Sequence, residues 1–166
     1  MFLSIITPCF NEEKNIENCI DQVKHFCQTK KISYEHIIAD NKSIDGTREI
    51  LKKFSLKDKN LKIIFNTRNF DPFKSTFNAL KYATGDVVLV SLAADMQDPI
   101  EILDSFLNNW KDGYKVVYGI RKNRKDGFLK KIFRLAYYKI YSLLTPYSFG
   151  NNVGEFMLID SSVHKI

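Results

Sequence analysis

Short apolar runs alternate with longer amphipathic segments along almost the whole chain. The runs that are rich in β-branched and aromatic residues predict strands at 2–6, 34–40, 61–65, 86–92, 114–119 and 155–160. The segments whose apolar residues recur at helical spacing predict helices at 12–28, 45–54, 73–83, 99–111 and 127–144. This alternation is typical of an α/β fold with a doubly wound, mostly parallel sheet that is sandwiched by helices.

Polar clusters follow several of the predicted strands. They occupy positions 7–13, 40–47, 68–71 and 95–98. Ligands of doubly wound sheets bind at the edge where the strands end, because the connecting loops meet there. Several polar loops that converge on one edge are a stronger signal than any one of them, and they predict a binding site at this edge.

The cluster at 95–98 leads into a predicted helix start. Asp98, Pro99 and Glu101 match the N-cap, N1 and N3 positions of a capping box, with proline where its missing N–H costs nothing. We therefore assign Asp98 to the helix cap. Asp95 follows a buried strand and lies outside the cap, so it is the better candidate for a functional carboxylate.

Length and cysteine content predict one cytoplasmic domain. The chain has 166 residues, about the length of a single domain, which we expect to span 1–166. Cys9, Cys19 and Cys27 form neither a CxxC pair nor a zinc-like pattern with histidine, which fits a reducing compartment. We find no basic signal region after Met1 and no apolar stretch near the roughly 20 residues of a membrane span.

Positive charge is concentrated in one segment. The net charge of +6 favours an anionic partner, and much of the excess lies in the segment 121–145. Within it, 127–144 combines apolar and aromatic residues with Lys130, Lys131 and Arg134. This composition is typical of a helix at an anionic membrane surface, and a buried amphipathic helix is the alternative. Nucleic-acid binding is disfavoured, because carboxylates at the sheet edge would repel phosphate unless a metal intervened.

Motifs in chain order point to a family. They are TPCFNEE (7–13), DNKSIDGT (40–47), RNF (68–70) with GD (85–86), AADMQDP (93–99), RKNRKD (121–126) and GEFMLID (154–160). Together they resemble the family-2 inverting glycosyltransferases, most closely the dolichyl- or undecaprenyl-phosphate sugar transferases. The resemblance implies a GT-A fold, a Rossmann-like nucleotide-sugar-binding domain. It also implies transfer of a sugar, with inversion, from a UDP- or GDP-sugar to a polyprenyl phosphate at the membrane surface.

The resemblance assigns the nucleotide-binding residues. Pro8, Phe10 and Glu12 would lie near the base and ribose of the donor, with Phe10 where the family often has tyrosine. Asp40 would recognise the edge of the base. A carboxylate accepts hydrogen bonds from ring or ribose donors, and an aromatic side chain offers a stacking face. The structural alternatives are a first-turn acid for Glu12 and a turn or cap residue for Asp40.

The resemblance also implies a divalent metal, Mg²⁺ or Mn²⁺. The family pattern is Asp-x-Asp-x-Gln-Asp-Pro, and Ala93 replaces its first aspartate, which leaves Asp95 and Gln97 as ligands. Magnesium often uses only one or two carboxylates, with waters and substrate phosphates completing its shell. The metal site is therefore expected to be weakened and to depend on the arriving nucleotide. The resemblance also makes Asp95 a candidate for nucleotide binding and for catalysis.

The remaining site residues follow from the later motifs. Glu155 matches the acidic residue of the family's Gly-Asp-Phe motif and would orient the attacking acceptor or act as a base; an ordinary charged residue on an edge strand is the alternative. Arg121 and Arg124 would bind the donor diphosphate or the acceptor phosphate, since guanidinium groups match phosphate oxygens; a solvated basic loop is the alternative. Met157 stands where the family usually has arginine.

A second class of function stays open, a nucleotide-sugar-binding module without turnover that acts with a membrane partner. Ala93, Met157 and Asp71, the last in place of a usual glycine, favour this alternative. The retained acidic and amide residues favour the enzyme. Members of the subgroup usually continue with further helices, so we expect a domain that is short at its C-terminus, lies at the cytoplasmic face of a membrane, and can form a homo-oligomer.

Overall fold

A computed structural model describes residues 1–120 and 153–164 of the chain. In chain order its elements are β1 (Phe2–Cys9), α1 (Ile16–Thr29), β2 (Ser33–Asp40), α2 (Thr47–Ser55), β3 (Leu61–Phe65), α3 (Pro72–Leu80), β4 (Val87–Val90), α4 (Ile102–Lys111), β5 (Val116–Ile120), β6 (Val153–Asp160) and α6 (Ser161–His164). Two compact units make up the chain, one of Met1–Val117 with Phe156–Ile166 and one of Tyr118–Glu155. The single domain over 1–166 stays a prediction.

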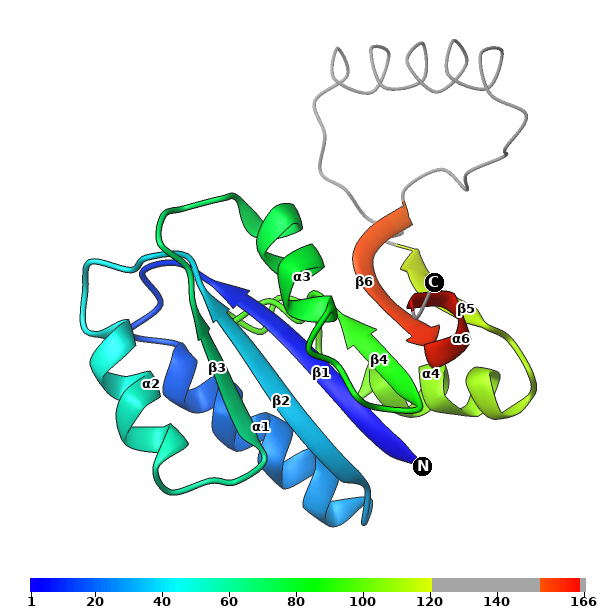
Figure 1. Ribbon diagram of the computed structural model, residues 1–166. Coiled ribbons are helices and arrows are strands. Elements are labelled where there is room, and N and C mark those ends of the chain that lie inside the picture. Colours follow the sequence, from blue (N-terminus) through cyan, green and yellow to red (C-terminus); the bar gives the residue numbers. More distant parts are fainter. Residues whose placement is uncertain (121–152, 165–166) are drawn as a thin grey trace, which may run out of the picture. The chain divides into compact units, whose positions relative to one another are not determined.

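The sheet has the strand order β3-β2-β1-β4-β6-β5 (Figure 1). Strand β1 pairs in parallel with β2 and with β4, and β2 pairs in parallel with β3, whereas β6 runs antiparallel to β4. The predicted mostly parallel α/β sheet is confirmed. From β1 the chain adds β2 and β3 on one side and β4 on the other, so the strand order reverses beside β1. Such a reversal opens a crevice at the carboxyl ends of the strands, where ligands of this fold class bind.

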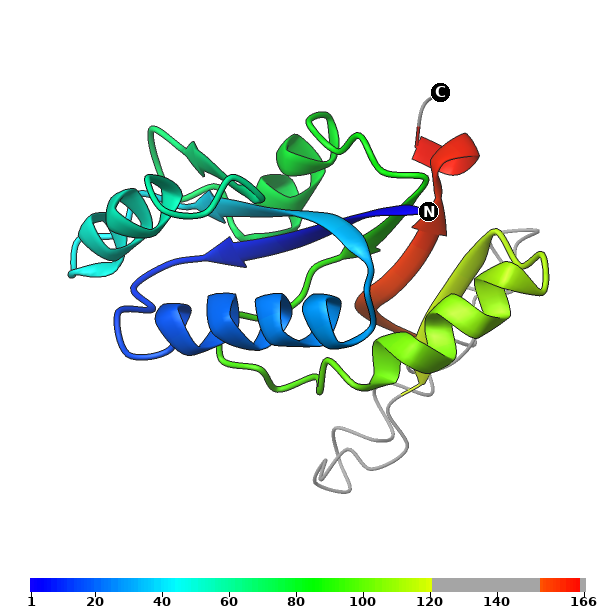
Figure 2. The ribbon, with the colours of Figure 1, turned by 90° about the horizontal axis from the view of Figure 1, so that it is seen from below.

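Helices cover both faces of the sheet. Helices α1 and α4 lie on one face and α3 lies on the opposite face (Figure 2). Because side chains alternate along a strand, Leu3 of β1 packs in a core with Val23 of α1 and Phe106 of α4. Ile6 of the same strand points to the opposite face of the sheet and packs with Ala79 of α3. Apolar side chains on both faces explain why β1 reads as a nearly continuous apolar run.

Helices α1 and α4 begin at least three residues later than the sequence predicts. Helix α1 begins at Ile16 instead of position 12, because the Glu12 carbonyl accepts the N–H groups of Asn15 and Ile16 in a turn. Helix α4 begins at Ile102 with Glu101 at the N-cap, whose side chain makes no capping hydrogen bond. The predicted start, with Asp98 at the N-cap and Pro99 at N1, is wrong, because the Pro99 carbonyl accepts the N–H of Ile102 in a 3₁₀-type turn before the helix.

A buried carboxylate ties the strands together at the opposite, amino edge of the sheet. Glu35 of β2 accepts hydrogen bonds from the Ser4 hydroxyl at 2.5 Å and from the Thr84 N–H at 2.7 Å, and it forms an ion pair with Lys62. Burial alone would raise the pKa of Glu35, but the bonds from Lys62, Ser4 and Thr84 lower it below its usual value. Gly85 fits beside this cluster because a Cβ there would lie 2.7 Å from the Ser4 nitrogen.

One histidine is buried in the core. His36 of β2 is 2% exposed, and its Nε2 lies 2.9 Å from the Thr7 hydroxyl of β1. The other ring nitrogen, Nδ1, has no hydrogen-bond partner among the described residues. Burial lowers the pKa of His36 from 6.5 to about 3, because a charged ring would lose its hydration, while Asp58 offsets this slightly. The folded chain therefore holds His36 neutral at every physiological pH.

His36 should make the fold sensitive to mild acid. The unfolded chain protonates His36 near its ordinary pKa of 6.5 while the folded chain does not, so stability falls as the pH drops below 6.5 toward 3. From pH 7 to pH 5 this linkage lowers the free energy of unfolding by about 2 kcal/mol. Urea titrations at both pH values should show that His36→Gln loses this part of the pH dependence. His25→Gln, at an exposed position, should keep it; an unchanged pH dependence in His36→Gln would contradict the assignment.

Candidate active site

The loops that follow β1, β2, β3 and β4 leave the same edge of the sheet. They span 10–15, 41–46, 66–71 and 91–101, between the strands and the helices given above. The strands are parallel, so these loops gather at the carboxyl edge, as the polar clusters in the sequence predict (Figure 1).

Hydrogen bonds join the first two loops. The N–H of Asn11 donates to the Ser43 hydroxyl at 2.9 Å, and the Asn11 side-chain oxygen accepts the N–H of Ile44 at 2.9 Å. The Glu12 N–H donates to the Thr47 hydroxyl at 2.8 Å. These bonds link segments that are distant in sequence, so the two loops behave as one braced surface.

The glutamates of the first loop have different partners. The Glu12 carboxylate accepts the side-chain amide of Asn15 at 2.8 Å and is partly exposed. The Glu13 carboxylate accepts the N–H of Gly46 at 2.8 Å, and the Glu13 N–H donates to Asp45 at 3.2 Å. Glu13 thus braces the second loop, while Glu12 keeps surface that a ligand can reach. The role of Glu12 at the donor ribose stays a prediction.

Asp40 ends β2 and is completely buried, with 0% exposure. Both of its oxygens lie 3.3 Å from the N–H of Ser43, and its Oδ2 lies 3.2 Å from Nε of Arg48, an ion-pair distance without hydrogen-bond alignment. The Arg48 guanidinium also lies 4.6 Å from the centre of the Phe65 ring. Direct contact between Asp40 and a base would need the second loop to move. Arg48 was not predicted, because nothing in its sequence neighbourhood marks its contact with Asp40.

Asn66 links the third loop to the second. Its side-chain nitrogen donates to Asn41 and to Ser75, at 3.0 Å each, and its backbone N–H donates to the Asp40 carbonyl at 2.9 Å. A hollow of about 260 Å³ opens beside it, lined by Asn66, Phe70, Lys74, Ser75 and Asn78. Asn66 was not predicted as a site residue. Its position directly after the apolar strand β3 is the sequence signal that could have identified it.

Asp95 and Gln97 lie together on the fourth loop. The Gln97 side-chain nitrogen donates to Asp95 Oδ2 at 2.6 Å, and both residues are exposed, while Ala93 offers no ligand atom. Within residues 1–120 and 153–164 no group of three or more His, Cys, Asp or Glu side chains could hold a metal ion. One carboxylate and one amide oxygen suit a hard divalent cation only if other oxygens complete its shell. The pair therefore fits an ion that arrives with a diphosphate.

The first loop begins with the predicted aromatic residue. Phe10 is 41% exposed, so part of its ring is available for stacking against a base. Pro8, the preceding candidate, is partly buried near the end of β1. Both residues lie at the carboxyl edge of the sheet, and their role in nucleotide binding stays a prediction.

Left-handed backbone conformations gather at this edge. Positive φ values occur at Asn11 (56°), Lys42 (61°), Asp71 (74°), Ser91 (61°) and Met96 (56°), all in the four loops. Such conformations cost energy in residues other than glycine and cluster at functional sites. Asp71, where the family usually has glycine, combines this φ with a cap hydrogen bond from the Lys74 N–H at 3.0 Å. The bond explains how an aspartate is accommodated at a position that favours glycine.

The structure is silent on the other predicted site residues. Glu155 belongs to β6, which lies between β4 and β5 and is not an edge strand, but its side chain is outside the described residues. Arg121 and Arg124 lie outside them too, together with the basic segment 121–145. In the described ranges, no helix has the length and apolar character to cross a bilayer.

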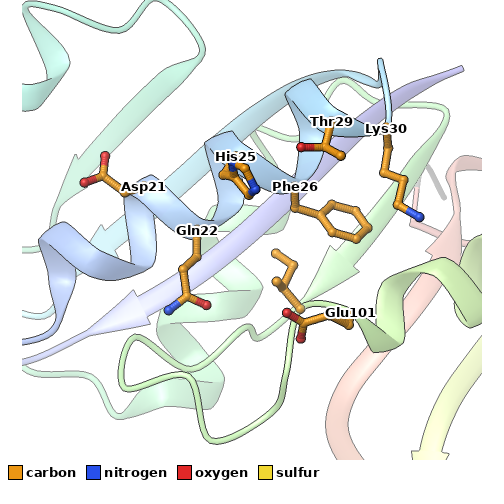
Figure 3. Close-up of a pocket in the computed structure, with 8 residues that line it drawn as sticks. Asp21, Gln22, His25, Phe26, Thr29, Lys30 and Glu101 are labelled. Atoms are coloured by element: carbon orange, nitrogen blue, oxygen red, sulfur yellow. The ribbon is translucent and has the colours of Figure 1, made fainter.

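Two other features are separate from this site. A hollow of about 420 Å³ lies between α1 and the start of α4, with His25, Phe26, Lys30 and Glu101 in its lining (Figure 3). It is lined by the later part of α1 and by the last two residues of the fourth loop, and in the described part of the chain none of the predicted site residues lines it. Cys19 and Cys27 are unpaired, and burial raises the pKa of both thiols to about 12, so they stay protonated.

Comparisons with known proteins agree with this geometry. The protein-family model for Glycosyl transferase family 2 matches residues 4–165. The uncharacterized glycosyltransferase YkcC of Bacillus subtilis is 35% identical over 161 residues, which cover 96% of this chain and 50% of that protein. The prophage bactoprenol glucosyl transferase homolog of Escherichia coli is 30% identical over 164 residues, which cover 98% and 53%.

Solved structures share the fold. Residues 1–349 of TarS from S. aureus match with a TM-score of 0.65 at 22% identity, covering 99% of this chain and 48% of that one. The complex of the same protein with UDP-GlcNAc matches at 0.56 and 25%, covering 76% and 36%. The mannosyltransferase PcManGT from Pyrobaculum calidifontis, in complex with GDP-Man and Mn²⁺, matches at 0.64 and 21%, covering 98% and 45%. These neighbours are GT-A glycosyltransferases, which confirms the predicted fold.

The chain spans about half the length of the curated relatives it matches. The family match nevertheless extends over almost all of the chain itself and includes every loop of the carboxyl edge. Sequence motifs, fold and relatives agree. The chain belongs to glycosyltransferase family 2.

Proposed function

We propose that this protein transfers a sugar from a UDP- or GDP-sugar to a polyprenyl phosphate at a membrane surface, with inversion. The observation that carries the proposal is the braced carboxyl edge, to which β1, β2 and β4 contribute Glu12, Asp40 and Asp95. The bactoprenol glucosyl transferase homolog among the relatives supports a lipid phosphate acceptor. The neighbours that hold UDP-GlcNAc and GDP-Man support a nucleotide-sugar donor without choosing its base.

In this proposal the first two loops bind the nucleoside. The Phe10 ring stacks on the base, Pro8 shapes the wall beside it, and the Glu12 carboxylate accepts hydrogen bonds from the ribose. The burial of Asp40 favours a positioning role over contact with the base. Its ion pair with Arg48 and its bonds to Ser43 hold the second loop in the conformation that braces the first.

A divalent metal belongs to the donor-bound state. Asp95 and Gln97 would hold Mg²⁺ or Mn²⁺ together with the donor diphosphate, and the ion would neutralise charge on the leaving group. The solved neighbour with Mn²⁺ supports a metal in general. Because Ala93 removes one carboxylate, we expect weak affinity for the free ion and strong coupling to the nucleotide.

Transfer itself depends on the later motifs. The acceptor phosphate is an anion at neutral pH, so Glu155 contributes mainly by orienting it for attack, because little deprotonation is needed. Arg121 and Arg124 bind the donor diphosphate or the acceptor phosphate. Attack on the face opposite the leaving diphosphate would give inversion.

A binding module without turnover is the second candidate. Its specific support is Ala93 in the metal motif and Met157 in place of the family's arginine. Such a module would bind donor yet neither transfer nor hydrolyse its sugar in the presence of a lipid phosphate. Product analysis with a short polyprenyl phosphate therefore separates the two candidates.

Donor binding tests the proposed function directly. Isothermal titration of UDP- and GDP-sugars into the purified chain, with Mg²⁺ or Mn²⁺ and then with chelator, should show metal-dependent binding of one base class. The metal dependence arises because the diphosphate supplies oxygens that the protein lacks. Absence of binding to every donor, from a chain whose circular dichroism shows it to be folded, would refute the donor site.

Replacement of Asp95 tests the metal. Asp95→Ala removes the exposed carboxylate and should abolish the metal-dependent part of donor binding. The affinity for donor at saturating metal ion should fall about 100-fold. Little stability should be lost, because the side chain is exposed and its hydrogen bonds to the described residues go to Gln97 alone. Asp21→Ala, at an exposed position on α1, is the matched control. Unchanged titration curves for Asp95→Ala would remove this residue from the mechanism.

Replacement of Arg48 tests the positioning role of Asp40. Arg48→Leu leaves a buried carboxylate without its ion-pair partner, which should lower the free energy of unfolding by about 1–3 kcal/mol. Adding Asp40→Asn should restore most of this stability, because the orphaned charge is gone. Denaturant titrations of both variants supply the measurement. If the double variant is no more stable than Arg48→Leu, the pair does not hold the loop.

A further inference from the structure

Helix α3 carries exposed aromatic side chains on its outer face. Phe73 and Phe77, one helical turn apart, are 65% and 70% exposed. The inner face of the same helix is buried through Ser75, Thr76 and Ala79. The fold therefore already uses one side of α3, and the phenylalanines lie on the other side.

Two large apolar residues at adjacent exposed positions are unusual on a soluble helix. The outer face of an amphipathic helix normally carries polar residues, and contiguous exposed apolar surface marks an interaction site. Ala79 of α3 packs in the core between this helix and the sheet. Neither phenylalanine belongs to a buried core cluster. Replacing the two phenylalanines with polar residues would therefore lower the stability of the described fold little. Packing within the fold does not explain why they are phenylalanines.

Lysines flank the phenylalanines. A shallow hollow of about 350 Å³ on this face is lined by Phe73, Lys74, Phe77, Asn78 and Lys81. Lys74 also lies 3.4 Å from Asp71, so Lys81 carries the less compensated charge of the two. We call Phe73, Lys74, Phe77 and Lys81 the α3 outer face. A surface that binds a membrane interface combines aromatic rings, which enter the bilayer, with lysine ammonium groups, which stay in water.

The α3 outer face adjoins the candidate active site. Helix α3 begins directly after the third loop, so its first turn lies at the carboxyl edge of the sheet. Lys74 and Asn78 line both this hollow and the hollow beside Asn66. A surface that binds the α3 outer face would therefore lie next to the loops that bind the donor.

We infer that the α3 outer face docks on an anionic lipid bilayer and turns the carboxyl edge toward it. The inference rests on the proposed function in that the acceptor is a membrane lipid. Phe73 and Phe77 enter the boundary between headgroups and acyl chains, while Lys81 meets lipid phosphates. A protein partner fits less well, because a helix of nine residues is only about 14 Å long and offers a fraction of a standard interface.

Vesicle sedimentation tests this surface on the full chain. Phe73→Ser/Phe77→Ser should weaken partitioning onto vesicles of phosphatidylcholine with one part in three phosphatidylglycerol by about tenfold, because two ring insertions are lost. Lys81→Gln should weaken it only at low salt. Leu56→Ser is the matched control: Leu56 is 89% exposed beside α2, at the opposite edge of the sheet, and its loss should change little.

Direct contact has its own readout. In a Phe77→Trp variant, brominated acyl chains should quench the tryptophan fluorescence. The quenching should exceed that of Trp110 in the unsubstituted chain. Equal partitioning of the double serine variant and the unsubstituted chain would overturn the inference, and so would an equal loss in Leu56→Ser. A change of oligomeric state in the double variant, seen by sedimentation velocity, would assign the face to self-association and also overturn it.

The outcome is separable from the proposed function. The double serine variant should bind donor as the unsubstituted chain does in titration calorimetry, since neither ring contributes to the braced loops. If the unsubstituted chain binds donor but does not bind these vesicles, the docking surface is overturned and the donor site stays intact. A triple Gln replacement of Lys130, Lys131 and Arg134, measured in parallel, reports separately on the predicted basic segment.

Discussion

Parallel pairing of β1 with both β2 and β4 is the constraint on which the site depends. Cys9 pairs with Asp40 on one side and Leu3 with Val87 on the other, so all three strands point the same way. Their loops consequently leave one edge, and the strand order changes direction beside β1, where ligands of this fold class bind. The hydrogen bonds between loops refine this arrangement but do not create it.

The two edges of the sheet differ in how their polar groups are satisfied. At the amino edge, Glu35 accepts hydrogen bonds from Ser4 and Thr84 and pairs with Lys62, and Gly85 lets the backbone approach closely. At the carboxyl edge, by contrast, several residues have a left-handed backbone conformation and some carboxylates are exposed. Of the six described non-glycine residues with positive φ, all but Lys31 lie in the loops of this edge, as expected where binding residues sit on loops held by a rigid scaffold.

Much of this fold could be read from the sequence, and the reasons for the exceptions are physical. The strand Leu61–Phe65 was predicted with its observed bounds, because a short apolar run between turn residues has few other solutions. The start of α4 could not be fixed, since a capping pattern also suits a run of turns. Arg48 and Asn66 escaped notice because their partners come from other loops, and only tertiary pairing brings them together. Contacts of this kind have no local pattern.

The position of β6 has a consequence for how the protein forms. Val87 of β4 pairs with Asp160 of β6, so a long stretch of chain must be made before this ladder can close. Strands β1 to β4 are complete at Val90, so they can pair while the later part of the chain is still being made. The strand that bears Glu155 is then among the last to be added. Trp110, the only tryptophan, donates to the Asp160 carboxylate at 2.7 Å, so its fluorescence can report that final step.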